Sequence, residues 1–293
     1  MRSLLLVAAA ALVAGAAPAK KLLTPNDIVA AAPASAWKAI PADDLMVIDL
    51  ANGGRVVVQL APEFAPVHVA NIKALARDGY WQGATVYRVQ DNYVAQWGQN
   101  DLKQPPKGIN PKPPAEYTRP LKGLTITPLG SPDPYAPGAG FANGWPVAYS
   151  ARAGWTDLAH CYGSVGVGRD LSPDTGTGGE LYAVIGQAPR QLDRNIALVG
   201  RVIDGIDRFS TLPRGTEALG FYKDKAQYVP IAGIRLASDM PAGQRPSYEV
   251  LDTASRTFAR YLKVRANRHD DFYFRPAGGV DLCNVQVPVR KKP

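Results

Sequence analysis

Two runs of aliphatic and β-branched residues, LMVIDLA at 45–51 and RVVVQLA at 55–61, are separated by Asn52-Gly53-Gly54. Asn-Gly between apolar runs is a strong hairpin signal, because both residues tolerate the positive φ of a tight turn. Similar strand-like runs follow at 84–89, 93–97, 163–168, 181–185, 198–203 and 229–236. This pattern predicts a mainly β, turn-rich protein.

Helical signals lie between and around these runs. Thr24-Pro25-Asn26-Asp27 combines a capping residue, a proline at the first helical position and an acid three residues after the cap, so residues 20–42 predict a short helical N-terminal arm. Pro66 opens a second helical pattern, which Gly79 ends. A short helix is expected at 204–212, and 252–268 has the apolar spacing of an amphipathic helix.

Residues 98–147 contain eleven prolines and seven glycines, and their only strand-like run is LTITPL at 124–129. Structureless loops of this length are uncommon inside compact domains. The aromatic residues of the segment supply anchors, so we expect an ordered surface excursion. These anchors are Tyr117, Tyr135, Phe141, Trp145 and, just beyond, Tyr149.

The first nineteen residues have the parts of a secretory signal peptide: Arg2, an apolar run from Leu4 to Val13, and small residues before a cleavage site. Cleavage after Ala16 and after Ala19 both satisfy the small-residue rule. No later segment has the ~18 consecutive apolar residues of a membrane span. We therefore expect an exported protein, in the periplasm or outside the cell, with no transmembrane span and no nucleic acid as partner.

The chain has two cysteines, Cys161 and Cys283. An even number of cysteines in an oxidising compartment allows a disulfide. Two unpaired, buried thiols are the alternative, and the sequence leaves both open.

The formal net charge is +8, and the basic residues do not gather strongly on one segment. The densest groups lie in the C-terminal extension, at 256–268 and 290–292. A solvated helix face and a soluble tail are the favoured interpretation. Contact of this extension with an anionic surface or an acidic partner is the alternative.

Several kinds of active site find no support. The three histidines, His68, His160 and His269, form no metal-binding motif. The glycines of GSVGVG at 163–168 lack the spacing of a dinucleotide loop, and no G-x-S-x-G motif of a serine hydrolase occurs. We expect no cofactor and no metal.

Two blocks resemble the cyclophilin-type peptidyl-prolyl cis-trans isomerases. Residues 53–101 carry a strand, then A-P-x-x-V-x-N-x-x-x-L-x-x-x-G-Y, then R-V followed seven residues later by glutamine. Residues 175–205, TGTGGELYAVIGQAPRQLDRNIALVGRVIDG, match the later strands and the L-D loop of that family. With the glycine-rich strand at 163–169, the resemblance covers about half of the chain.

The resemblance implies a closed eight-stranded antiparallel barrel capped by two helices. It places the barrel at 43–237 with an insertion at 98–147, between the arm at 20–42 and a C-terminal extension at 238–293. One barrel with appendages is expected, rather than two domains.

The resemblance also implies a groove for a substrate proline. Arg88 falls at the catalytic arginine and Gln96 at the groove glutamine. The remaining substrate-binding candidates surround them, and they are Tyr93, Val94, Tyr182, Leu192, Glu180 and Arg169.

Four positions are compared with the family pattern. Glu180 stands where glutamine is usual, Arg169 where asparagine or arginine is frequent, Gln191 at a variable aromatic position, and Ile196 at a frequent histidine. Glu180 is interpreted as an ordinary charge on the rim, with an ion pair to Arg88 or Arg169 as the alternative. The function implied is isomerisation of X-Pro bonds in proline-containing polypeptide clients. The competing interpretation is a catalytically weak module or scaffold that only binds proline-containing segments.

Overall fold

The computed structural model describes residues 22–99, 108–187 and 189–292. The expected signal segment at 1–19 lies outside these residues. The described part of the chain has no helix that is long and apolar enough to cross a bilayer.

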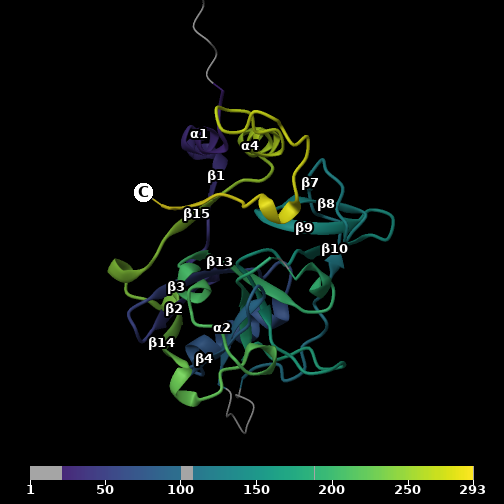
Figure 1. The fold of residues 1–293 in the computed structure, drawn as a ribbon. Helices are drawn as coiled ribbons and strands as arrows, with labels where there is room; N and C mark the ends of the chain where they lie inside the picture. Colours follow the sequence, from purple (N-terminus) through teal and green to yellow (C-terminus); the bar gives the residue numbers. More distant parts are fainter. Residues whose placement is uncertain (1–21, 100–107, 188, 293) are drawn as a thin grey trace, which may run out of the picture.

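Eight antiparallel strands close into a barrel in the order β11-β12-β5-β4-β14-β2-β3-β13, as the resemblance implied (Figure 1). The strands are β2 (Leu45–Leu50), β3 (Arg55–Leu60), β4 (Thr85–Val89), β5 (Val94–Gly98), β11 (Ser164–Val167), β12 (Leu181–Val184), β13 (Leu198–Asp204) and β14 (Val229–Leu236). The predicted hairpin joins β2 to β3, with Gly53 at a φ of 85°.

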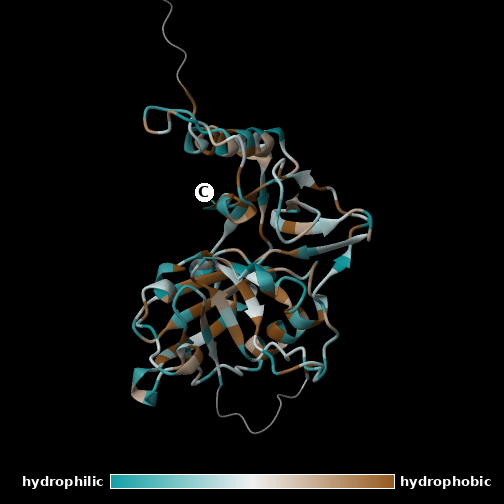
Figure 2. Ribbon diagram, turned by 45° about the vertical axis from the view of Figure 1, so that its right-hand side comes forward, coloured by the Kyte–Doolittle hydropathy of each residue, from teal (hydrophilic) through white to brown (hydrophobic). Residues whose placement is uncertain are grey.

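Alternate residues of most strands fill the barrel interior, because successive side chains on a strand point to opposite faces. In β4 and β14 a register shift interrupts this alternation. Helices α2 (Pro66–Arg77) and α3 (Asp207–Ser210) contribute to the same core. Phe209 of α3 stacks on Trp97 of β5 with ring centres 5.1 Å apart. Figure 2 shows hydrophobic residues concentrated in these strands.

Residues 25–39 of the N-terminal arm, 119–158 from the insertion through β10, and 248–291 of the C-terminal extension gather at one side of the barrel (Figure 1). We call these segments together the second lobe. It holds helices α1 (Pro25–Ala30) and α4 (Arg256–Ala266), and a three-stranded sheet of β1 (Trp37–Ala39), β15 (Tyr248–Leu251) and β16 (Val289–Lys291). Its second sheet has β6 (Arg119–Pro120), β7 (Thr127–Pro128), β8 (Gly138–Ala142), β9 (Trp145–Ser150) and β10 (Trp155–Leu158).

The insertion therefore contains more strand than LTITPL, and the sequence-based expectation is wrong on this point. Its glycines sit inside strands where neighbours approach closely. A Cβ atom on Gly138 would lie 2.6 Å from the Tyr149 ring, and one on Gly140 would lie 2.4 Å from the carbonyl oxygen of Thr127. Such glycines hide the alternating pattern by which a strand is predicted.

The second lobe has a hydrophobic core of its own, which continues onto the outer face of β2 and β3. Phe141 of β8 and Phe258 of α4 meet edge to face at 5.0 Å. Cys161 and Cys283 form a disulfide, which settles the alternative that the sequence left open. This bond ties the chain just before β11 to the C-terminal extension.

Candidate active site

A row of four residues crosses four neighbouring strands on the outer face of the barrel. Arg88 of β4 pairs with Gln96 of β5, Gln96 with Tyr182 of β12, and Tyr182 with Gly166 of β11. The alternate residues of these strands point into the core, so these four share the outer face. Strand register thus brings together residues that lie almost a hundred positions apart.

Arg88 is half-buried and held by three acceptors. Its Nε donates to the carbonyl oxygen of Leu219 at 2.7 Å, one terminal nitrogen donates to Gln96 Oε1 at 2.9 Å, and the other donates to Gln90 Oε1 at 2.6 Å. The guanidinium carbon lies 5.5 Å from the centre of the Phe221 ring. Burial lowers the pKa of Arg88, yet an arginine stays charged at neutral pH. Two of its five N–H groups remain free among the described contacts.

A chain of hydrogen bonds fixes the other side of Gln96. Its Nε2 donates to the Tyr87 hydroxyl at 2.6 Å, and that hydroxyl donates to Glu180 Oε2 at 2.5 Å. Burial is the main cause that raises the pKa of Glu180 to about 7, and burial also raises the pKa of Tyr87. Gly98 makes room for the carboxyl group, since a Cβ there would lie 2.1 Å from Glu180 Oε2.

Glu180 is thus neither of the two things that the sequence suggested. It is mostly enclosed rather than an open rim charge, and the described contacts include no ion pair from it to Arg88 or Arg169. Its carboxyl group instead ends the hydrogen-bond chain that orients the Gln96 amide.

An apolar cluster lies beside Gln96 on the same face, at the place expected for the substrate proline, and we call it the proline pocket. Val94, Tyr182 and Val184 form its buried floor, and Tyr93 and Ile196 pack against them. Gly166 leaves space for the Tyr182 ring, because a Cβ there would lie 2.2 Å from the hydroxyl oxygen. The pocket is apolar and adjoins a guanidinium, which suits a ring attached to a polar amide.

The hydroxyl group of Tyr182 has a hydrogen-bond partner in the protein interior. It lies 2.9 Å from Nε2 of the buried His160, whose Nδ1 lies 2.8 Å from Asp193 Oδ1. Burial raises the pKa of Tyr182 well above its usual value. The sequence analysis assigned His160 no role beyond the absence of a metal-binding motif, so this hydrogen bond to Tyr182 was missed.

The same network reaches the insertion. Arg190 donates to both carboxylate oxygens of Asp133 at 3.0 Å, and its Nε donates to Asp193. Asp133 belongs to the insertion, so a buried chain of charges connects that segment to the floor of the pocket.

Two predicted residues lie apart from this arrangement. Leu192 sits on the 3-10 turn Arg190–Leu192 and is not among the residues packed against the pocket floor. Arg169 donates to the carbonyl oxygens of Asn195 and Asp170, so its guanidinium braces a loop. Phe221 and Leu219, which do contact Arg88, come from a segment without a recognisable motif.

The described residues hold no group of three or more histidine, cysteine or carboxylate side chains that would bind a metal ion.

Comparison with known proteins identifies the family. The model of the cyclophilin type peptidyl-prolyl cis-trans isomerases matches residues 45–235, which is more than half of the chain. The chain therefore belongs to this family, and its activity is peptidyl-prolyl cis-trans isomerisation.

Individual relatives agree with that assignment. A probable peptidyl-prolyl cis-trans isomerase of Brucella suis is 25% identical over 176 residues, which cover 60% of this chain and 74% of the relative. Peptidyl-prolyl cis-trans isomerase B of Bacillus subtilis is 41% identical over 49 residues, 17% of this chain and 34% of that protein. The crystal structure of cyclophilin AquaCyp293 from Hirschia baltica has the same fold, with a TM-score of 0.70 and 24% identity over 92% of this chain and 97% of that one.

Proposed function

We propose that Arg88 is the catalytic residue of this isomerase and that it acts on the amide before a substrate proline. Rotation about an amide costs about 18–20 kcal/mol, because resonance gives the C–N bond double-bond character. In the twisted transition state that resonance is lost, and the prolyl nitrogen becomes pyramidal and basic. A donor that binds the twisted amide better than either planar form lowers the barrier.

The observation that carries this proposal is the placement of Arg88. Three acceptors hold its guanidinium at the edge of an apolar pocket, and two N–H groups remain free for the amide. The Tyr182 and Val94 side chains provide a floor for the pyrrolidine ring. Gln96, oriented by Tyr87, presents its amide to the peptide backbone. With the ring held, the preceding residue rotates.

The test is an isomerisation assay on short X-Pro peptides with Arg88→Ala. We expect kcat/KM to fall on the order of 10²–10³-fold, the usual cost of a lost transition-state donor. Arg235→Ala is the matched control: Arg235 is a barrel-strand arginine that pairs with Asp49 of β2 and is not among the described contacts of Arg88. Circular dichroism and the unfolding midpoint verify that both variants fold.

Two results would contradict the proposal. Full activity in Arg88→Ala would remove Arg88 from the mechanism. A folded wild type without activity on any X-Pro peptide would leave the competing function, a module that binds proline-containing segments without turning them over.

The proposal includes export of the protein. The disulfide between Cys161 and Cys283 supports it, because such bonds persist in oxidising compartments. Expression of the full-length sequence in a bacterium, followed by fractionation and N-terminal sequencing, tests it. A mature chain starting after Ala16 or Ala19 in the periplasmic or external fraction is expected, and an uncut cytoplasmic chain would contradict export. Contact of the basic α4 face with an anionic surface stays a prediction.

A further inference from the structure

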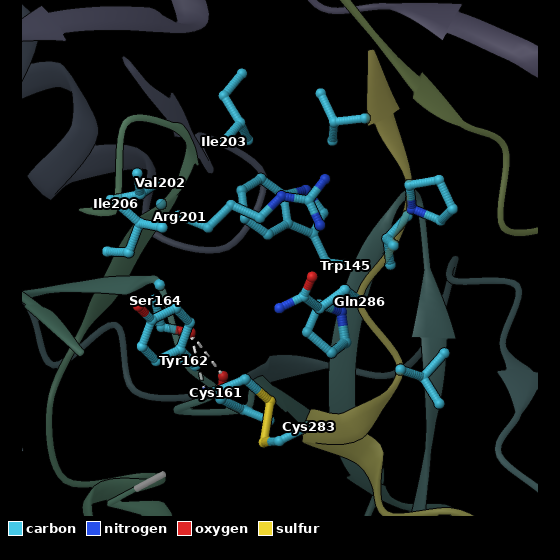
Figure 3. Close-up of a pocket in the computed structure, with 18 of the residues that line it drawn as sticks. Trp145, Cys161, Tyr162, Ser164, Arg201, Val202, Ile203, Ile206, Cys283 and Gln286 are labelled. Atoms are coloured by element: carbon cyan, nitrogen blue, oxygen red, sulfur yellow. Dashed lines mark hydrogen bonds between the residues drawn. A yellow bond between two sulfur atoms is a disulfide. The ribbon is translucent and has the colours of Figure 1, made fainter. Parts of the chain in front are cut away.

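A cavity of about 510 Å³ lies between the barrel and the second lobe (Figure 3). Arg201 and Val202 of β13 form its barrel wall. Trp145 of β9, Gln286 and the disulfide form the opposite wall. In the order of strands around the barrel, β13 lies four positions from β4, so the cavity is on the side opposite to Arg88.

Arg201 extends from the barrel wall into this cavity, with its guanidinium in front of the Trp145 ring (Figure 3). The guanidinium carbon lies 4.6 Å from the ring centre. Nε and one terminal nitrogen both donate to Gln59 Oε1, at 3.1 and 2.8 Å. The other terminal nitrogen has no hydrogen bond in the described part of the chain. One edge of the guanidinium therefore has free donors that face the cavity.

No carboxylate compensates this charge. The structure shows no ion pair of Arg201 with any described residue, and enclosure by the protein lowers its pKa to about 10. It is nevertheless cationic at neutral pH. The two acidic residues of the cavity wall have other partners, since Asp204 pairs with Lys291 and Asp207 with Arg208. Arg201 is partly buried, and a partly buried cation without a counter-ion is unfavourable, so a cavity that contains one is suited to anions.

The rest of the wall sets the character of the ligand. Much of it is aliphatic, including Ile203, Ile206 and Val287. A volume of this size accommodates a small organic molecule, and ligand pockets commonly combine apolar walls with few polar groups. Guanidinium edges bind carboxylates through two parallel hydrogen bonds.

We propose that this cavity is a binding site for an organic carboxylate with an apolar body, held by the free edge of Arg201 and by the Trp145 ring. The carboxylate group can belong to a small acid or to the C-terminus of a polypeptide. Both sources present the same group to Arg201, and the site is independent of isomerase activity.

Isothermal titration of the full mature chain with octanoate tests the proposal, with octan-1-ol as the uncharged probe of equal length. Saturable binding of octanoate, at least tenfold tighter than octan-1-ol, is expected. A second arm compares acetyl-Leu-Val-Leu as the free acid and as the amide. Preference for the free acid would support a polypeptide C-terminus as the source, and binding of octanoate alone would support a small acid.

Variants locate the bound anion. Arg201→Met, which keeps an unbranched apolar stem and removes the charged guanidinium, is expected to weaken octanoate binding at least tenfold. Arg260→Met on the exposed face of α4 is the matched control and retains binding, as does Arg88→Ala in the groove. No saturable binding of either acid to the wild type would overturn the proposal, whether or not Arg201→Met folds. Loss of octanoate binding in Arg88→Ala rather than in Arg201→Met would also overturn it.

Discussion

Arg88 and Arg201 occupy opposite faces of one barrel and have the same kind of partners. Each donates to a glutamine directly across the neighbouring strand, Gln96 or Gln59, and each lies over an aromatic ring. Their surroundings differ. The described contacts of Arg88 include no residue of the second lobe, whereas Arg201 lines a cavity between the barrel and the second lobe. The two sites therefore share an arginine, a cross-strand glutamine and an aromatic ring, and they differ in what covers that face of the barrel.

The two arginines also differ in how firmly they are fixed. Three separate acceptors hold Arg88, and one acceptor holds Arg201. A guanidinium fixed in advance costs little reorganisation when charge develops in a transition state. A guanidinium with a free edge keeps more N–H donors available to bind a ligand. The comparison thus contrasts the setting of the proposed catalytic arginine with the setting of the proposed ligand-binding arginine.

The largest expected effect concerns the covered face. Replacing both Cys161 and Cys283 by serine removes the bond that ties the extension to the barrel. We expect a loss of about 2–5 kcal/mol in the free energy of unfolding, because the bond closes a long loop. Denaturant unfolding measures it, and hydrogen exchange should show faster exchange in β15 and β16 than in β4 and β5.

Added reductant is the control, since it should destabilise the wild type and leave the double variant unchanged. If the amide hydrogens of β4 and β5 exchanged as much faster as those of β15 and β16, the barrel and the second lobe would unfold as one unit, which would contradict this prediction.

The next effect concerns the fixed arginine. Arg88→Lys keeps the charge but cannot donate to Leu219, Gln90 and Gln96 with the fixed geometry of a guanidinium. We expect kcat/KM on X-Pro peptides to fall roughly 10–100-fold, less than in the alanine variant. Arg235→Lys serves as the control. Wild-type activity in Arg88→Lys would mean that a positive charge alone suffices. The number of acceptors that hold the Arg88 guanidinium would then not explain its activity.

The smallest effect concerns Glu180. Burial raises the pKa of its carboxyl group to about 7. Ionisation places a negative charge near the groove and weakens the positive potential of Arg88. We expect kcat/KM of the wild type to fall a few-fold as pH rises through about 7. Glu180→Gln should keep the low-pH activity across that range. A pH profile of the variant that still falls at pH 7 would assign the change to another group.

The same shift has a consequence for stability. A carboxyl group whose pKa is higher in the folded state favours folding at pH values below its ordinary pKa of 4.5. That contribution is lost as pH rises through about 7. Glu180→Gln should therefore be destabilised less than the wild type between pH 5 and pH 8, as measured by unfolding midpoints.

The strands of the barrel were predictable from local signals, because apolar runs and the Asn52-Gly53 turn determine strands and their first pairing. The closure of the barrel was implied by the family resemblance alone. The strands of the second lobe were harder to predict from local signals. Its strands are rich in glycine and proline, and their pairing depends on contacts with α4 and the C-terminal segment. Long-range contacts of that kind leave no periodic pattern in the sequence.

The site shows the same division. Strand register brings Arg88, Gln96 and Tyr182 together, as the motifs indicated. The supporting groups come from elsewhere: His160 precedes β11, and Phe221 belongs to a loop. A lone buried histidine or a loop phenylalanine has no distinctive sequence context, so only the folded structure reveals that each contacts a groove residue.

The buried chain from Asp133 through Arg190 to His160 limits how this protein can be reduced or recombined. Cutting out the insertion to obtain a bare barrel would remove Asp133 and leave Arg190 enclosed with one counter-ion fewer. The buried guanidinium beneath the proline pocket would then keep Asp193 as a partner but lose two hydrogen bonds. The proline pocket and the insertion are therefore structurally coupled. A chimera between relatives has to exchange both segments together.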